Sequence, residues 1–249
     1  MIVIDRFVQH TSSRIVGWAA AAQAPQFLVQ RLIRWFACMY KINLDEATRP
    51  ISEYSSLGAF FTREIRSECR PISSATVVSP TDGDVISTGH VSDGMVVQVK
   101  GRTYSVASLL GGSHTNYQSF ATIYLSPKDC HRIFSPVQGQ IVSTRLIPGC
   151  LYPVRQKQLR AIPHLYCKNE RLVSIITVAG GHQVALVAVG ALNVGSMTTT
   201  FDRGKLPLSI TPGEWIKTFH LGSTVVVLDT RKLKLPAFGP IQYGDALFE

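Results

Sequence analysis

The segment that reads FHLGST, from Phe219 to Thr224, places a serine hydroxyl where it could react. Ser223 directly follows Gly222 and precedes the apolar run VVVLD, so the hydroxyl lies at the mouth of an expected strand. A hydroxyl at such an accessible place can act as a nucleophile when a base activates it. The same pattern, taken alone, more often marks a turn that opens a strand.

Two further segments hold acids and a histidine. The stretch SPTDGD at 79–84 puts Asp82 and Asp84 in a turn, which by itself indicates only turn chemistry. The stretch YLSPKDCHR at 124–132 puts His131 close to Asp129 and to two cations. Histidine exchanges protons near neutral pH, although a single loop histidine is more often structural or solvated than catalytic.

In this order and spacing, the three segments resemble those of the phosphatidylserine decarboxylases. The resemblance runs over most of the chain and is carried by several blocks together: YKINLDEATRPISEYSSLGAFFTREIR, SPTDGDV, YLSPKDCHRIFSP, LIPGCLYPV, KNERL, VGALNVGS and FHLGST. Each block is weak evidence alone, but their combination is specific.

The resemblance implies a proenzyme that cuts itself between Gly222 and Ser223. In that family the serine hydroxyl attacks the preceding carbonyl, and an N-to-O shift gives an ester. Elimination and loss of ammonia then leave a pyruvoyl group on the new amino terminus. The group forms a Schiff base with the substrate amine and takes up the electrons released as carbon dioxide leaves. The expected cofactor is therefore a covalent pyruvoyl group made from Ser223, without a metal ion or pyridoxal phosphate.

The resemblance also implies roles for the acids and the histidine. His131 is the candidate that returns a proton to the α-carbon, a step for which an imidazole of near-neutral pKa is suited and which is typically worth ~10²–10⁴-fold. Asp82 matches the aspartate that acts with a histidine to activate Ser223 for cleavage. Asp129 matches an acid that precedes the histidine pair, and it receives no role.

Two positions depart from the family pattern. Relatives usually read H-x-x-H where this chain has His131 and then Phe134, and the missing second histidine is the one assigned to cleavage. Three alternatives follow: His131 serves both steps, another base such as His220 has taken over, or the chain stays uncut. Lys217 stands where the family usually has glycine, a change that could alter processing or be neutral.

Composition indicates a globular chain with an anionic partner. The 249 residues carry a formal net charge of +9, 45% are hydrophobic and only 16% are charged, which excludes intrinsic disorder. The five cysteines are scattered without a C-x-x-C pair, which favours reduced thiols over a zinc site or a disulfide framework. Neither a secretory signal nor a membrane-spanning segment is expected.

The first part of the chain, 13–66, is expected to be largely helical. Pro25 can open a helix in which Phe27, Leu28, Leu32, Trp35, Phe36 and Met39 recur at near-helical spacing, and a second helix is expected over 56–66. The aromatic stripe favours an amphipathic anchor on an anionic membrane about as much as a helix packed on its own core.

After Pro71, short β-rich runs alternate with turn residues. They lie at 76–79, 95–99, 121–125, 140–146, 172–178, 183–189 and 223–229, and 233–249 is expected to be loop with a short edge strand. The predicted fold is α+β, with N-terminal amphipathic helices (1–70) before a mostly antiparallel sandwich or barrel-like catalytic core (71–249).

The leading functional hypothesis is decarboxylation of phosphatidylserine to phosphatidylethanolamine at a membrane. The expected location is peripheral, on the cytoplasmic side of the cell membrane, and relatives suggest a homodimer. Alternatives are an uncleaved lipid-binding pseudoenzyme, which Phe134 favours, and a family decarboxylase of a soluble amino acid. Nucleic acid is not an expected partner, because the cations do not interleave with aromatic residues on strands.

Overall fold

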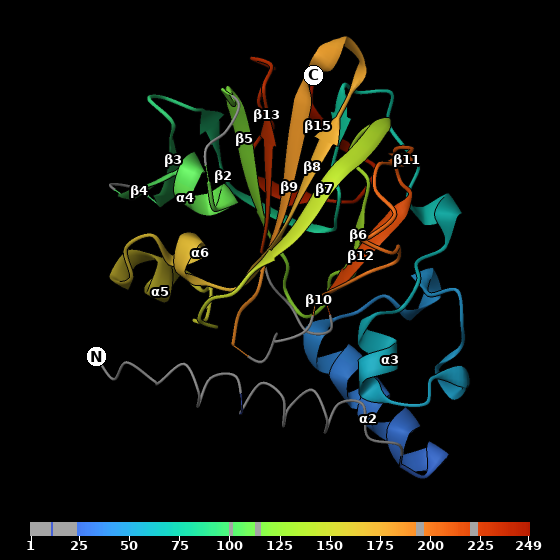
Figure 1. Cartoon of the computed structure of the whole chain (residues 1–249). Helices are drawn as coiled ribbons and strands as arrows, with labels where there is room; N and C mark the ends of the chain where they lie inside the picture. Colours follow the sequence, from blue (N-terminus) through green and yellow to red (C-terminus); the bar gives the residue numbers. More distant parts are fainter. Residues whose placement is uncertain (1–10, 12–23, 100–101, 113–115, 193–196, 220–223) are drawn as a thin grey trace.

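The computed structural model describes residue 11 and residues 24–99, 102–112, 116–192, 197–219 and 224–249 (Figure 1). Helices α2 and α3, within residues 26–61, lie on one side of a large twisted sheet, and the short helices α4, α5 and α6, within residues 106–168, lie on another side, near β3 and β4 within residues 95–105. The predicted α+β class is confirmed.

The helical part is built around α2 (Gln26–Tyr40), which begins directly after Pro25 and ends at Lys41 in a left-handed conformation. It packs against the short helix α3 (Leu57–Phe61), whose first turn is capped by the side chain of Ser56. Three 3-10 turns complete this part: η1 (Leu44–Glu46), η2 (Ile51–Glu53) and η3 (Ser67–Cys69).

The helical expectation was too extensive for the described part of 13–66. The chain between α2 and α3 consists of 3-10 turns and loops, and α3 stops at Phe61 where a helix to residue 66 was predicted. The reason is tertiary: the amide of Thr48 donates to Glu64 O at 3.0 Å, the amide of Arg66 donates to Glu46 O at 2.8 Å, and Ala47 forms an antiparallel bridge with Ile65. These bonds hold the segment after α3 extended.

Helix α2 has one buried face and one exposed apolar face. Val29, Ile33 and Ala37 are buried against the helical part, in a cluster with Tyr54 and Phe60. On the exposed side lie large apolar side chains: Phe27 (68% exposed), Leu28, Leu32, Trp35 (57%) and Met39. No helix among the described residues is both long and apolar enough to cross a bilayer.

The main sheet has eight antiparallel strands in the order β11-β7-β8-β9-β13-β5-β2-β14. It has two edges, so the described strands form an open sheet and not a closed barrel. Their bounds are β2 (Gly83–His90), β5 (Ser119–Tyr124), β7 (Gly139–Ile147), β8 (Arg171–Thr177), β9 (Gln183–Val189), β11 (Leu208–Ile210), β13 (Thr224–Asp229) and β14 (Gly239–Ile241).

A smaller sheet has the order β10-β12-β6, and two strand pairs, β1-β15 and β3-β4, lie beside the sheets. The remaining elements are β1 (Val77–Val78), β3 (Met95–Val99), β4 (Arg102–Ser105), β6 (Arg132–Phe134), β10 (Met197–Thr199), β12 (Trp215–Phe219), β15 (Ala246–Phe248), α4 (Val106–Leu110), α5 (Gln156–Ala161), α6 (Leu165–Lys168) and η4 (Ala179–Gly181). Each β-rich run of the sequence corresponds to one of the described strands, and the C-terminal stretch supplies β14 and β15.

Strand β13 is the centre of this arrangement. It pairs with β5 on one side and β9 on the other, and all six of its residues are buried. A continuous apolar run is what a strand covered on both faces requires. The fold therefore fixes Thr224, the residue after Ser223, at the end of the most buried strand.

The apolar side chains form one large cluster within residues 77–248 and a smaller one within residues 29–60. A third cluster joins Ile65 to Cys130, Phe134 and Tyr243, and so connects the two parts of the chain. The expected boundary at residue 70 stays a prediction.

Candidate functional site

The expected cleavage bond, Gly222–Ser223, lies outside the described residues, as does His220. The residues on either side are well defined. Phe219 ends β12, and its amide donates to His131 O at 2.9 Å. Thr224 begins β13, paired with Tyr124 and Val189. The FHLGST motif thus leaves the small sheet beside His131 and enters the large sheet at β13.

The side chain of His131 is completely buried, and its two ring nitrogens differ in their surroundings. Its Nδ1 lies 2.8 Å from the carbonyl oxygen of Asp129, which can only accept a hydrogen bond, so Nδ1 carries the proton. Nε2 is buried without a partner among the described residues. The ring packs on Phe61 with centroids 3.9 Å apart. His131 therefore presents an unshared electron pair at a fixed position.

Burial lowers the pKa of His131 to about 3; the Asp129 carbonyl opposes this shift, and the charge of Arg63 adds to it. This differs from the near-neutral imidazole that the sequence analysis favoured. The ring is therefore neutral at physiological pH.

Asp82 is buried in a bidentate ion pair with Arg70. Arg70 Nε lies 3.1 Å from Oδ1 and Nη2 lies 2.9 Å from Oδ2, and the amide of Tyr243 donates to Oδ1 at 2.9 Å. Arg70 also donates to Glu46 Oε2 at 2.8 Å. Although burial opposes it, the hydrogen bonds and charges of the two acids raise the pKa of Arg70 above its ordinary value.

The structure places the Asp82 turn against the His131 segment without joining the two side chains. The amide of Phe134 donates to Pro80 O at 2.8 Å, and the hydroxyl of Thr81 donates to Cys130 O at 3.4 Å. Next to this turn, Gly83 permits β2 to approach the end of β5 closely, because a Cβ there would lie 2.4 Å from Tyr124 O. No hydrogen bond joins Asp82 and His131 in the described part of the chain.

Phe134 occupies the neighbourhood of Asp82 where the family pattern has its second histidine. Its ring stacks on Tyr243 with centroids 3.9 Å apart and planes at 17°, and Tyr243 is the residue whose amide caps Asp82. A phenyl ring cannot exchange a proton. In this chain, Arg70 and Tyr243 meet the hydrogen-bonding needs of the Asp82 carboxylate.

Lys217 is a fully buried amine in β12. Its Nζ donates to Leu186 O at 3.2 Å, and burial lowers its pKa to about 7. Leu186 pairs with Val227, which lies three residues after Thr224 on β13. The Lys217 amine therefore lies near the middle of the large sheet and not at the end where β13 begins.

Two residues of the site escaped the sequence analysis: Arg70 and Tyr243. Arg70 binds Asp82 and Glu46 through its side chain, and Tyr243 binds Asp82 through its backbone amide. These partners lie 12 or more residues away, so no local pattern marks the two residues. Asp129 has a structural role instead. Its carboxylate accepts from the amide and hydroxyl of Ser126 at 2.7 Å, and its carbonyl fixes the tautomer of His131.

No group of three or more metal-binding side chains occurs among the described residues. The unpartnered Nε2 of His131, beside the strand that leads into the serine motif, fits a site where a proton is moved next to a pyruvoyl group.

Comparison with known proteins gives one consistent family. The family described as "Phosphatidylserine decarboxylase" matches residues 57–244. The chain is 38% identical to the phosphatidylserine decarboxylase proenzyme of Herminiimonas arsenicoxydans, covering 85% of this chain and 79% of that protein. Identity to the proenzyme of the same name from Brevibacillus brevis is 37%, covering 91% and 87%. Identity to the proenzyme of the same name from Shewanella amazonensis is 39%, covering 88% of this chain and 85% of that protein.

Proposed function

The chain belongs to the phosphatidylserine decarboxylase family and is a carboxy-lyase, and from this premise we propose that it converts phosphatidylserine to phosphatidylethanolamine after cutting itself between Gly222 and Ser223. The observation that carries the proposal is His131, a buried and neutral imidazole. Its Nε2 has no partner among the described residues, and its backbone carbonyl accepts from Phe219 in the strand that leads into the serine motif.

A single acceptor can serve both stages of this reaction. Before cleavage, Nε2 of His131 takes the proton of the Ser223 hydroxyl, so that the oxygen can attack the Gly222 carbonyl. This is the first of the three alternatives left by the sequence. It is supported by the tautomer that Asp129 imposes and by the absence of a proton-exchanging group at Phe134.

After cleavage, the pyruvoyl group on residue 223 would supply an electron-withdrawing carbonyl that accommodates the electrons left when the carboxylate departs as carbon dioxide. The substrate amine arrives protonated and must lose a proton before it can react. His131 Nε2 accepts that proton and returns it to the α-carbon.

The exposed face of α2 supports a peripheral membrane location. Phe27, Leu28, Leu32, Trp35 and Met39 give an apolar face, and the exposed Arg31 and Arg34 lie on the same helix. Such a combination binds in the interface of an anionic bilayer. The cytoplasmic side and the homodimer stay predictions of the family resemblance.

The test uses the full chain with vesicles of phosphatidylcholine containing phosphatidylserine. Release of carbon dioxide and formation of phosphatidylethanolamine are expected from the wild type, with loss of both in Ser223→Ala and His131→Gln. His182→Gln, an exposed histidine, is the matched control and should retain activity. A wild type that binds these vesicles but releases no carbon dioxide would instead indicate a lipid-binding pseudoenzyme.

A further inference from the structure

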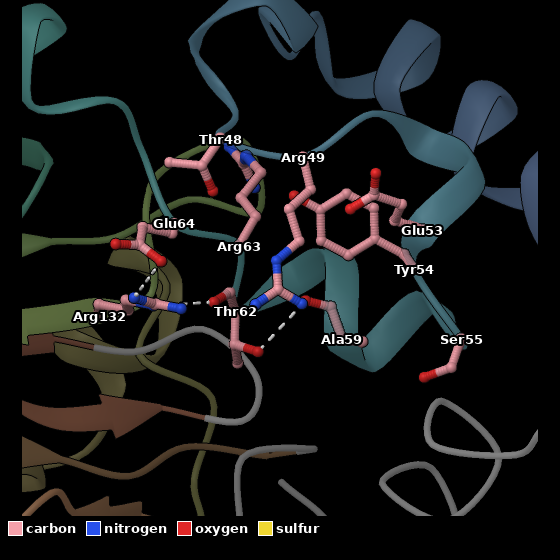
Figure 2. Close-up of a pocket in the computed structure, with 10 residues that line it drawn as sticks. All are labelled: Thr48, Arg49, Glu53, Tyr54, Ser55, Ala59, Thr62, Arg63, Glu64 and Arg132. Carbon is pink, nitrogen blue, oxygen red and sulfur yellow. Dashed lines mark hydrogen bonds and ion pairs between the residues drawn. The ribbon is translucent and has the colours of Figure 1, made fainter.

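A pocket of about 230 Å³ lies between the helical part and the first residue of β6 (Figure 2). Its walls come from the segment after η1, from α3 and the residues that follow it, and from Arg132. The lining residues are Thr48, Arg49, Glu53, Tyr54, Ser55, Ala59, Thr62, Arg63, Glu64 and Arg132.

Two buried side chains of this pocket have unused hydrogen-bond donors. Arg63 is only 4% exposed; its Nη2 donates to Lys128 O at 2.6 Å, but Nε and Nη1 have no partner among the described residues. Tyr54 is 5% exposed, and its hydroxyl also lacks a partner there. A guanidinium does not lose its proton in proteins, so these donors require an acceptor.

Among the charged side chains around the pocket, Arg63 is the buried cation that has no ion-pair partner among the described residues. Arg132 is already engaged: it lies 3.4 Å from Glu64, donates to Thr62 O at 3.1 Å and stacks over Trp215. Arg49 is exposed at the pocket, as is Glu53. Three guanidinium groups therefore face two carboxylates, and neither carboxylate forms an ion pair with Arg63 in the described part of the structure. The missing component is an anion with several acceptor oxygens.

We propose that this pocket binds the phosphodiester of the phospholipid substrate, with Arg63 Nε and Nη1 and the Tyr54 hydroxyl as its donors. The proposal rests on the proposed function and names the substrate subsite. A phosphodiester offers two charged oxygens that a guanidinium can hold together.

The position of the pocket fits a headgroup phosphate. On one side, Phe61, two residues before Arg63, packs on His131. On the other side, the side-chain amide nitrogen of Gln26, at the start of α2, donates to Ser52 O at 2.8 Å and Tyr54 O at 3.1 Å. The pocket wall is thereby tied to the helix with the exposed apolar face. In the substrate, the acyl chains lie on one side of the phosphorus, and only an oxygen and a methylene separate it from the α-carbon.

The reaction also favours phosphate over carboxylate as the partner of Arg63. The carboxylate of the substrate loses its charge as carbon dioxide forms, so an ion pair with it would stabilise the ground state more than the transition state. The phosphodiester keeps its charge throughout. Binding it therefore anchors the substrate without opposing the chemistry.

The experiment measures binding of soluble glycerophosphoserine to the uncut Ser223→Ala protein by calorimetry, without a membrane. Arg63→Met should weaken binding at least tenfold, and Tyr54→Phe, which removes one hydroxyl, about threefold to tenfold. Arg203→Met, an exposed cation outside the pocket, should leave it unchanged. Thermal unfolding of each variant checks that the fold is retained.

Two further experiments are needed. The first distinguishes a lipid headgroup from free phosphate as the ligand, and the second distinguishes the phosphate subsite from the proposed decarboxylase function. Inorganic phosphate binding as tightly as glycerophosphoserine, with the same dependence on Arg63, would overturn the lipid assignment. In the cut enzyme, Arg63→Met should raise KM for phosphatidylserine at least tenfold with a smaller effect on kcat. An unchanged KM in an active enzyme would refute the subsite. Binding that depends on Arg63 in a wild type without decarboxylase activity would support the subsite and refute the proposed function.

Discussion

Replacing Arg70 with methionine tests whether this arginine joins the helical part to the acid beside the active site. Its side chain is 5% exposed and lies between Asp82, 6% exposed, and Glu46, 25% exposed. Methionine keeps much of the volume but removes the charge and the donors to both carboxylates. The change leaves a buried carboxylate with only the Tyr243 amide as a described donor.

The expected cost follows from that burial. Removing one partner of a buried ion pair typically destabilises a protein by about 3–5 kcal/mol. At about 2–4 °C per kcal/mol for a chain of this size, the melting temperature should fall by about 10 °C. Arg66→Met provides the matched control, because its ion pair with Glu68 is exposed and should contribute about 1 kcal/mol or less.

The assay is chemical and thermal unfolding of the uncut Ser223→Ala protein, so that a single chain unfolds. The double variant Arg70→Met with Asp82→Asn should lose less than the sum of the single losses, because it removes both buried charges. If Arg70→Met lowered stability no more than Arg66→Met does, Arg70 would not stabilise the buried Asp82 carboxylate. If the losses of stability in the double variant were strictly additive, the ion pair between Arg70 and Asp82 would not be their cause.

Three further predictions concern other parts of the molecule. Phe134→His should speed self-cleavage by ~10²-fold or more, followed on gels after pulsed expression, and an unchanged rate would show that no base is lacking there. Because the pKa of Lys217 is about 7 when folded and 10.5 when unfolded, the unfolded chain binds more protons between these pH values, and the free energy of unfolding should rise with pH. Urea unfolding between pH 8 and pH 9.5 should show the free energy of unfolding of the wild type rising by about 1.4 kcal/mol per pH unit more than that of Lys217→Met. Equal slopes for the two proteins would contradict a buried amine of lowered pKa. Trp35→Ala should weaken binding to anionic vesicles about tenfold, whereas Phe238→Ala, which removes an aromatic side chain that is even more exposed, should not. Equal losses of binding in the two variants would argue against α2 as the anchor.

Several strands could be predicted because their sequence signal is local, although β2 (Gly83–His90) and β12 (Trp215–Phe219) were not among the predicted runs. The run after Ser223 is apolar throughout, as a strand covered on both faces must be, and it became β13. The helix expected over 56–66 failed because a long-range pairing of Glu46–Thr48 with Glu64–Arg66 competes with the helical bonds. Amphipathic spacing does not reveal such a competitor.

The candidate site was predictable only in part, for a similar reason. His131 and Asp82 stand in motifs, but the burial that lowers the pKa of His131 depends on Phe61, which lies far away in the sequence. The partner of Asp82 proved to be Arg70, which no motif marks. A family pattern names residue types at positions, whereas protonation and pairing follow from the packed structure.

The central claim is that this chain makes its own cofactor at residue 223 despite Phe134. Intact mass of the freshly purified full chain under denaturing conditions tests it most directly. The account predicts two products, 1–222 and 223–249, the second beginning with a pyruvoyl group, and only the uncut mass in Ser223→Ala. A single uncut mass in the wild type, with no carbon dioxide released from phosphatidylserine, would contradict it.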